Sequence, residues 1–304
     1  MTEAAMSWFY LLDAEQEQQI GALVERATTM DGVAPISEQA VHRLTGRSGA
    51  EHVLWTLDDA IVGYAGLEPA HDGHPAMVEA VVDPEHRGRA IGRALIREAL
   101  RRGGPGTRVW AHGDLPAARA VADRLGLRAA RELLQLRRTL AEPALPEVVV
   151  PDGVTLRTYA GPADDADLLR VNAEAFDWHP EQGAWTQREI DERVAEGWFD
   201  PKGLFVASDA ETGAMLGFHW TKVHTATADA PAIGEVYVVA IAPSAQGRGL
   251  GRLLTVAGLQ YLRDRGLDSV LLYTEADNVA ALHTYDRLAF ERYHVDVAYE
   301  GAQG

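Results

Sequence analysis

Two hydrophobic patterns alternate along the chain, short apolar runs and longer stretches with helical spacing. The segments 236–242 (VYVVAIA) and 269–274 (SVLLYT) are almost continuously apolar, which is typical of strands buried on both faces of a sheet. Helical patterns are found at 14–29, 165–176 and 186–198. Because strands alternate with helices, we predict an α/β fold in which a mixed central sheet is flanked by helices.

The clearest helical patterns follow two glycine-rich turns. In the second half of the chain the apolar positions are Leu250, Leu253, Leu254, Ala257 and Tyr261. In the first half they are Ile91, Ala94, Leu95 and Ala99. This spacing places each set on one helical face, so both segments are predicted to be amphipathic helices.

The same order of elements occurs twice in the chain. The first copy includes 52–69 and 76–102, and the second includes 203–223 and 234–266. Each copy reads as strand, turn, strand, long strand, glycine-rich turn, helix, strand, helix and last strand. Such self-similarity is the signature of a duplicated unit.

A linker is predicted between the copies. Residues 141–153 contain three prolines and few periodic positions. A chain of 304 residues also suits two domains better than one. We therefore predict domains at 1–140 and 154–304, joined by the linker.

The glycine-rich turn at 243–254 (PSAQGRGLGRLL) lies between a strand and a helix. It lacks the Gly-Lys-Ser/Thr end of a P-loop and the sixth-position glycine of the dinucleotide fingerprint. The first amides of a helix have no partner within the helix, and the helix dipole favours negative charge beside them. Gly249 and Gly251 allow close approach to the backbone, and Arg248 and Arg252 add positive charge. The turn is predicted to hold a diphosphate, although a turn without a ligand is the alternative.

Two motifs together resemble the acetyl-CoA site of the GCN5-related N-acetyltransferase (GNAT) family. The first is Gln246-x-x-Gly249-x-Gly251 after a long strand. The second begins at Asn278 and continues through Tyr285, seven residues later on the same helix. The resemblance implies that each domain has the GNAT fold, that acetyl-CoA is the co-substrate, and that Asn278 holds its pantetheine arm. The implied contacts in the second domain are Val239, Ala240, Ile241, Gln246, Gly247, Arg248, Gly249, Leu250, Gly251, Arg252, Asn278, Val279, Ala280, Ala281, Leu282 and His283.

Acetyl transfer to an amine needs a base for the amine and an acid for the leaving thiolate. Glu235 begins the central strand and is the candidate base, and a carboxylate at the surface end of a strand is its alternative. Tyr285 is the candidate acid, with a packed aromatic side chain as its alternative. The chain has no cysteine, so a cysteinyl acyl-enzyme is excluded and direct transfer is expected.

The first copy departs from the family pattern. Its turn, 84–95 (PEHRGRAIGRAL), has Ala90 where the second copy has Gly249. Leu115 and Ala122 occupy the positions of Asn278 and Tyr285. We therefore expect the first domain to be degenerate and the second to be catalytic. The first domain keeps a cofactor cradle, for which the resemblance implies Ala80, Val81, Val82, Gly88, Arg89, Ala90, Ile91, Gly92 and Arg93.

Longer segments resemble the mycothiol synthases, tandem-repeat GNAT enzymes of actinobacteria. They include 216–224 (LGFHWTKVH) and 179–183 (HPEQG), and the resemblance covers nearly the whole chain. It implies acetylation of the cysteinyl amine of cysteinyl-glucosaminyl-inositol. The implied acceptor contacts are Glu38, Glu181, Lys222, Glu235 and Tyr273. Each glutamate has a solvated surface group as its alternative, and Tyr273 an inward strand aromatic.

Two other functions remain open from the sequence. One is a GNAT enzyme with another acceptor, such as a peptide N-terminus or an aminoglycoside. The other is a non-catalytic module that binds acyl-CoA.

The composition of the chain limits the kinds of partner that we expect it to bind. A net charge of −17 disfavours a surface for nucleic-acid phosphates. No apolar run of 18 residues and no secretory pattern is present, so a monomeric cytoplasmic protein without membrane contact is expected. His71 and His74, like His219 and His224, lack a third ligand, so these histidines are expected to be solvated or hydrogen-bonded and no metal is expected.

Overall fold

The repeat predicted from the sequence appears in the order of the elements. A computed structural model describes residues 4–45, 49–71, 74–177, 182–226 and 231–301. The first half contains β1 (Ala4–Phe9), α1 (Ala14–Asp31), α2 (Glu38–Leu44), β2 (Glu51–Leu57), β3 (Ala60–Glu68), β4 (Met77–Val82), α3 (Ile91–Gly103), β5 (Arg108–Ala111), α4 (Pro116–Leu125) and β6 (Leu127–Thr139). The second half contains β7 (Val154–Thr158), α5 (Asp165–Ala175), α6 (Gln187–Val194), β8 (Leu204–Asp209), β9 (Met215–His224), β10 (Ile233–Ile241), α7 (Leu250–Asp264), β11 (Ser269–Glu275), α8 (Val279–Arg287) and β12 (Glu291–Gly301). The short 3₁₀ helices are η1 (Pro84–His86), η2 (His112–Asp114), η3 (Pro162–Asp164), η4 (Gln182–Ala184), η5 (Pro201–Gly203) and η6 (Pro243–Ala245).

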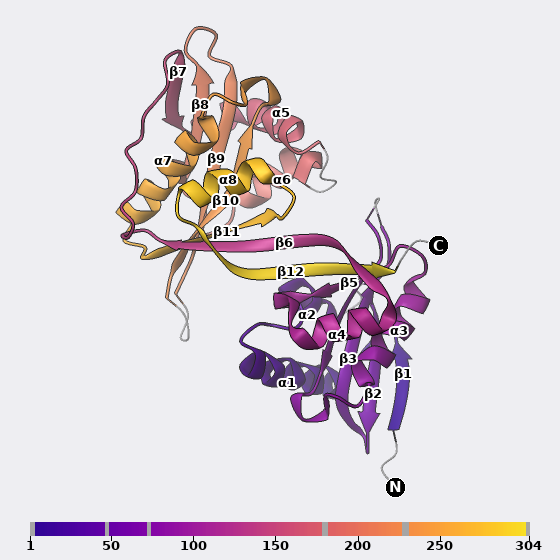
Figure 1. Ribbon diagram of the computed structural model, residues 1–304. Helices are drawn as coiled ribbons and strands as arrows, with labels where there is room; N and C mark the ends of the chain where they lie inside the picture. Colours follow the sequence, from indigo (N-terminus) through magenta and orange to yellow (C-terminus); the bar gives the residue numbers. More distant parts are fainter. Residues whose placement is uncertain (1–3, 46–48, 72–73, 178–181, 227–230, 302–304) are drawn as a thin grey trace. The chain divides into compact units, whose positions relative to one another are not determined.

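Each compact unit is built on a mixed sheet, as predicted. In the first unit the strand order is β1-β2-β3-β4-β5-β12, in the second it is β11-β10-β9-β8-β7, and β6 has residues in both units (Figure 1). Parallel pairs occur between β4 and β5 and between β10 and β11, while β2, β3 and β4 pair antiparallel. In each unit the parallel pair adjoins the helix that follows the glycine-rich turn.

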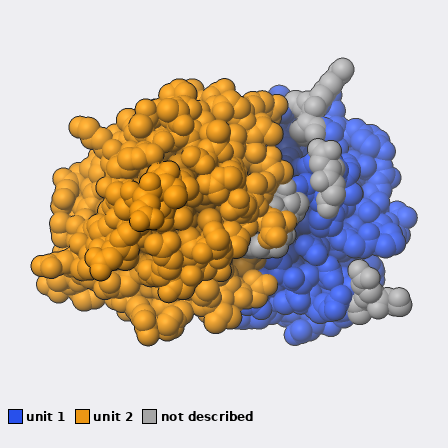
Figure 2. All heavy atoms as spheres, turned by 90° about the horizontal axis from the view of Figure 1, so that it is seen from above, with its two compact units in different colours: residues 1–133, 294–304 blue, residues 134–293 orange. Residues whose placement is uncertain are grey.

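The boundaries of the compact units differ from the division at 140 and 154. The first unit consists of residues 1–133 and 294–304, and the second of residues 134–293 (Figure 2). The end of β12 pairs with β5 in the first unit, with Val297 opposite Ala111 and Glu300 opposite Arg108. Strand patterning shows which residues can pair but not which sheet edge receives them, so the last strands could not be assigned from the sequence.

In α7, the helix after the second glycine-rich turn, more residues are buried than the single apolar stripe predicted from the sequence. Nine residues of α7 are buried, including Thr255 and Gly258 outside the predicted set. Tyr261 is half-buried, and its hydroxyl donates to Asp200 at 2.7 Å. The core of the second unit therefore surrounds α7 and fixes the position of its N-terminus.

The helix predicted over 186–198 ends earlier, at Val194. It begins at Gln187, and the cap residue before it, Thr186, forms a capping box with Glu189. Beyond Val194 the chain turns, and the rings of Trp198 and Phe199 pack against Trp220 of β9 at 6.1 and 5.6 Å between centroids. The free energy gained by burying these aromatic rings exceeds what continuing the helix would contribute.

Candidate active site

The central strand of the second unit separates from its parallel neighbour partway along its length. Pairing of β10 with β11 covers only Gly234 to Val236, although β10 continues to Ile241. The register of β10 against β9 also shifts between Val236 and Val238, which marks a β-bulge. Beyond Val236, the edge of β10 that faces β11 leaves main-chain groups available to a ligand. The predicted contacts Val239 to Ile241 lie along this edge.

The glycine-rich turn of the second unit lies at the N-terminus of α7, where the diphosphate cradle is predicted. Gly247 and Gly249 both have φ of +77°, a left-handed conformation in which glycine avoids steric strain. Gly249 is the residue before the first turn of α7, and it has no side chain to cap the helix amides. A Cβ atom added at Gly251 would meet no atom within 4 Å, so the surface beside the helix end is open. Free amides, open space and the exposed Arg248 fit a diphosphate.

Glu235 is buried, with 8% of its surface exposed. It lies on β10 opposite Lys222 of β9. Its carboxylate Oε2 lies 2.6 Å from Nε2 of His224, the last residue of β9. Glu235 is therefore enclosed and hydrogen-bonded, unlike a solvated surface group at the end of a strand.

Lys222 does not form an ion pair with the glutamate opposite it. Its ammonium group lies 5.1 Å from the ring centre of Trp198 and 5.4 Å from that of Tyr237. Nε of Arg193 on α6 donates to the Tyr237 hydroxyl at 2.9 Å. Two aromatic rings therefore hold the ammonium group of Lys222, and Arg193 fixes one of these rings through its hydroxyl.

Tyr285 lies on α8 and packs its ring against Phe290, with 5.5 Å between the ring centres. Burial raises the pKa of Tyr285 to about 12, so its hydroxyl keeps its proton at neutral pH. A protonated hydroxyl can donate to a leaving thiolate. Within the described parts of the chain, no hydrogen bond joins Tyr285 to Glu235, so the structure leaves the candidate acid and base as separate groups.

Asn278 has a structural task in addition to its predicted one. It precedes the first turn of α8, and its side-chain oxygen accepts from the amide of Ala281 at 3.1 Å. The cap uses the oxygen of the amide group, and the NH₂ group remains the side that can donate to a ligand. Residues 279–283 follow as the first turn of α8.

The remaining predicted acceptor contacts have different surroundings. Tyr273 is 47% exposed on β11, so it is not an inward-facing strand aromatic, and its hydroxyl accepts from Nε2 of Gln135 at 2.6 Å. Glu38 is exposed in the first turn of α2 in the first unit. Glu181 lies outside the described residues.

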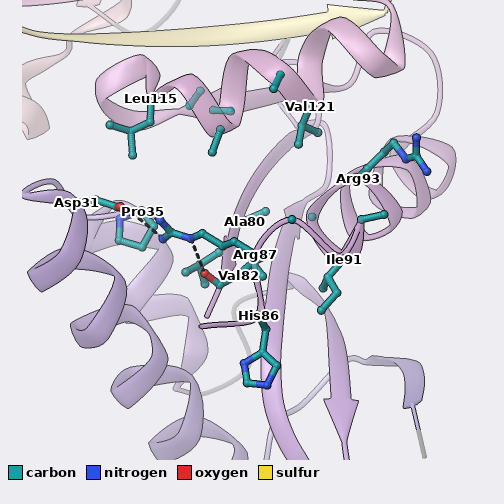
Figure 3. Close-up of a pocket in the computed structure, with 18 of the residues that line it drawn as sticks. Asp31, Pro35, Ala80, Val82, His86, Arg87, Ile91, Arg93, Leu115 and Val121 are labelled. Atoms are coloured by element: carbon teal, nitrogen blue, oxygen red, sulfur yellow. Dashed lines mark hydrogen bonds and ion pairs between the residues drawn. The ribbon is translucent and has the colours of Figure 1, made fainter. Parts of the chain in front are cut away.

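The first unit contains a cavity of about 410 Å³ beside its own glycine-rich turn. Figure 3 shows Ala80 and Val82 of β4, Ile91 and Arg93 of α3, and Val121 of α4 around it. Of the nine cofactor contacts predicted for this unit, all but Arg89 line the cavity. The space and the cradle therefore occur together in the first unit.

Ala90 reproduces the backbone conformation of its glycine counterpart. Its φ is +65°, close to the +77° of Gly249. A left-handed conformation costs an alanine roughly 1–2 kcal/mol. Arg87, at the position of Gln246, donates to both carboxylate oxygens of Asp31 at 2.7 Å, so this cation ties the turn to α1 (Figure 3).

Several residues of these sites were not identified from the sequence as functional. His224 was assigned only to a group of solvated or hydrogen-bonded histidines, and its place beside Glu235 depends on strand register. Trp198 and Tyr237 carried no motif. Arg87 of the first unit stands at the first position of the glycine-rich motif, but its ion pair with Asp31 was not predicted. A register prediction for β9 and β10 is the one signal that could have paired His224 with Glu235.

The other three histidines singled out from the sequence, His71, His74 and His219, each have a main-chain partner. His219 is fully buried, and its Nδ1 lies 2.8 Å from the carbonyl oxygen of Leu254. Burial lowers its pKa to about 4 despite that hydrogen bond. His71 and His74 form an isolated bridge. Among the described residues, no three metal-ligating side chains gather at one point. In the same residues no helix is long and apolar enough to cross a membrane.

The chain is similar to known proteins along nearly its whole length. The model of the acetyltransferase (GNAT) family matches residues 15–127 and 171–290. A protein of Rhodococcus opacus (strain B4) named mycothiol acetyltransferase is 62% identical over 99% of this chain and 100% of its own. One of the same name from Mycolicibacterium smegmatis is 54% identical over 96% of this chain and 97% of its own.

Solved structures resemble the fold at lower identity. A GCN5-related N-acetyltransferase from Sphaerobacter thermophilus aligns with a TM-score of 0.71 and 21% identity, over 97% of this chain and 94% of its own. A tandem GNAT protein from the clavulanic acid biosynthesis pathway aligns with a TM-score of 0.67 and 21% identity, over 98% of both chains.

Proposed function

Since the chain belongs to the acetyltransferase (GNAT) family, we propose that it transfers the acetyl group of acetyl-CoA to the cysteinyl amine of cysteinyl-glucosaminyl-inositol, the last step of mycothiol synthesis. The observation that carries this proposal is that proteins named mycothiol acetyltransferase are 62% and 54% identical to this chain along nearly its whole length. The second unit supplies the site because it has both an enclosed carboxylate and a buried tyrosine hydroxyl.

The reaction assigns one task to each group. Acetyl-CoA supplies the acetyl group as a thioester, held at its diphosphate by the amides of 247–252. Glu235 takes one proton from the substrate ammonium, directly or through water, so that the nitrogen can attack. The N–C bond forms as the C–S bond breaks, and Tyr285 gives a proton to the departing sulfur. Of the two protons that the nitrogen loses, one is released to water and the other balances the new thiol.

The acceptor is recognised by a small set of polar and aromatic groups. The proposed contacts are Glu38, Glu181, Lys222, Glu235 and Tyr273. A substrate with sugar hydroxyls and an ammonium group suits carboxylates and a lysine, since both form charge-assisted hydrogen bonds. The rings of Trp198 and Tyr237 add an apolar wall beside Lys222.

The first unit is proposed to bind the cofactor without catalysing transfer. It keeps the turn and the cavity, but Ala122 replaces the tyrosine of the second unit. An aspartate substituted at the matching position of each glycine-rich turn tests the two units one at a time. Its carboxylate would repel the diphosphate, and the backbone conformation at the two positions is the same. Gly249→Asp is expected to abolish turnover, and Ala90→Asp to weaken cofactor binding in the first unit without abolishing turnover.

The decisive experiment is a steady-state assay of the full chain with acetyl-CoA and a panel of amines. The panel contains the cysteinyl glycoside, a peptide with a free N-terminus and an aminoglycoside. The highest kcat/KM is expected for the cysteinyl glycoside. Faster turnover of the peptide or the aminoglycoside would reject the proposed acceptor, and loss of turnover in Ala90→Asp alone would reverse the roles of the units.

The expected setting is a monomer in the cytoplasm, where acetyl-CoA is available. The net charge of −17 opposes binding to the phosphates of nucleic acids or to an anionic membrane surface. Size-exclusion chromatography with light scattering tests the monomer, and a mass of twice 33.0 kDa would contradict it.

A further inference from the structure

The base proposed for the second unit is enclosed, and every turnover must return its proton to water. The Glu235 side chain is 10% exposed, whereas the side chain of His224 beside it is 40% exposed. A carboxylate with so little exposure exchanges protons slowly with bulk water. His224 offers a path from the buried base to the solvent.

The hydrogen bond between the two side chains follows from strand register. Glu235 pairs with Lys222 across the β9–β10 ladder, and Ile233 pairs with His224. His224 is therefore the diagonal neighbour of Glu235 on the same face of the sheet. The distance of 2.6 Å between Nε2 and Oε2 is that of a short, direct hydrogen bond.

The lysine opposite Glu235, Lys222, does not pair with its carboxylate. The ammonium group of Lys222 lies over the rings of Trp198 and Tyr237 rather than on the carboxylate opposite it. Among the described residues, the side chain that hydrogen-bonds to the Glu235 carboxylate is that of His224. The other carboxylate oxygen, Oε1, is then available to the substrate ammonium or to a water molecule.

We propose that His224 is the positioning residue and proton relay of Glu235, an inference that rests on the proposed function of the second unit. An N–H bond of the substrate ammonium breaks as the Glu235 carboxylate takes the proton. Nε2 of His224, in the Nδ1–H tautomer, then takes a proton from the carboxyl group at Oε2, and the imidazolium releases the proton on Nδ1 to water. This leaves the ring as the Nε2–H tautomer, and proton exchange of the exposed ring with water restores the Nδ1–H tautomer before the next turnover, so nothing is oxidised or reduced.

The relay is tested with His224→Ala and His224→Gln in the full-length chain. His224→Ala is expected to lower kcat/KM for the amine by about tenfold to a hundredfold, which is the lower part of the range for acid–base catalysis. The KM for acetyl-CoA is expected to stay unchanged. Added imidazole is expected to restore turnover in proportion to its concentration, because the position opens to solvent.

The glutamine variant separates positioning from proton transfer. Its side-chain amide can donate to the carboxylate but cannot accept and release a proton, so it is expected to remain slow without rescue by imidazole. His71→Ala is the matched control, because His71 also lies near a carboxylate, Glu68 at 3.9 Å, with 53% of its side chain exposed. It is expected to retain wild-type turnover.

The outcomes distinguish the relay from the proposed function. Wild-type rates in His224→Ala or His224→Gln, while the wild-type enzyme acetylates the cysteinyl glycoside, would overturn the relay alone. Slow turnover of His224→Ala that imidazole cannot restore would also overturn it. A wild-type chain that turns over no amine would overturn the proposed function and the relay together.

Discussion

A buried imidazole in the first unit gives a stability prediction that can be worked from the structure. His112 lies between two carboxylates, with Nε2 3.5 Å from Glu79 and Nδ1 3.5 Å from Asp296, and 15% of its side chain is exposed. Burial by itself lowers the pKa of His112, but the carboxylates of Asp296 and Glu79 outweigh it and raise the pKa to about 9. Asp296 belongs to β12, so this cluster fastens the last strand to the first unit.

The size of the effect follows from linkage. The pKa rises from 6.5 to about 9, a difference of 2.5, and each unit corresponds to about 1.4 kcal/mol. The charged imidazole therefore contributes about 3 kcal/mol to the free energy of unfolding of the first unit. Because the folded-state pKa is the higher one, this contribution is complete below pH 6.5 and is lost as the pH rises through 9. Burial raises the pKa values of Glu79 and Asp296, but the interactions with His112 outweigh it, so both pKa values are lowered. The stability that these two carboxylates contribute is therefore lost as the pH falls.

The perturbation is His112→Gln, and the assay must resolve the two units. Urea unfolding followed by hydrogen exchange of peptides from β5 and β12 reports on the first unit, and urea avoids the screening that a guanidinium salt adds. We expect the variant to lose about 3 kcal/mol at pH 6 and much less at pH 9.5. His71→Gln, which changes an exposed histidine, is the control and is expected to show neither effect.

The reasoning would be refuted by a wild-type first unit whose unfolding free energy is the same at pH 6 and pH 9.5. It would equally be refuted if His112→Gln kept the wild-type slope between these pH values. Either result would mean that the imidazole is neutral in the folded chain and that its neighbours do not hold it charged.

Three further substitutions test other parts of the second unit. Tyr285→Phe removes the proposed acid and is expected to lower kcat about a hundredfold with little change in the KM for acetyl-CoA, measured by steady-state kinetics; an unchanged kcat would remove its role. Gly258→Ala places a Cβ atom 2.1 Å from Cε1 of His219, so a loss of about 2–3 kcal/mol in urea unfolding is expected, and a neutral result would show that the helix can shift. Arg138→Leu removes a buried guanidinium that donates to three carbonyl oxygens, one of them that of Leu288, and a loss of about 2–4 kcal/mol in the same measurement is expected; full stability would indicate that water replaces the donors.

The sequence by itself determined the elements, their repetition and the position of the glycine-rich turn. A continuous apolar run and a helical stripe with a period of 3.6 residues are both local patterns, so they suffice to place β10 and α7. The glycine-rich turn between a strand and a helix is likewise a local pattern, although the left-handed conformation of Gly247 and Gly249 became visible only in the structure. These features depend on residues close together in the chain.

Only the tertiary structure decided the features that join distant residues. The pairing of β12 with β5, the hydrogen bond from His224 to Glu235 and the two carboxylates around His112 all depend on which strands become neighbours. Local pattern cannot fix this, because any strand edge offers the same main-chain donors and acceptors and the choice among them is made by packing of the whole sheet. The elements and the glycine-rich turn were therefore readable from neighbouring residues, whereas the electrostatic surroundings of Glu235 were set by the fold.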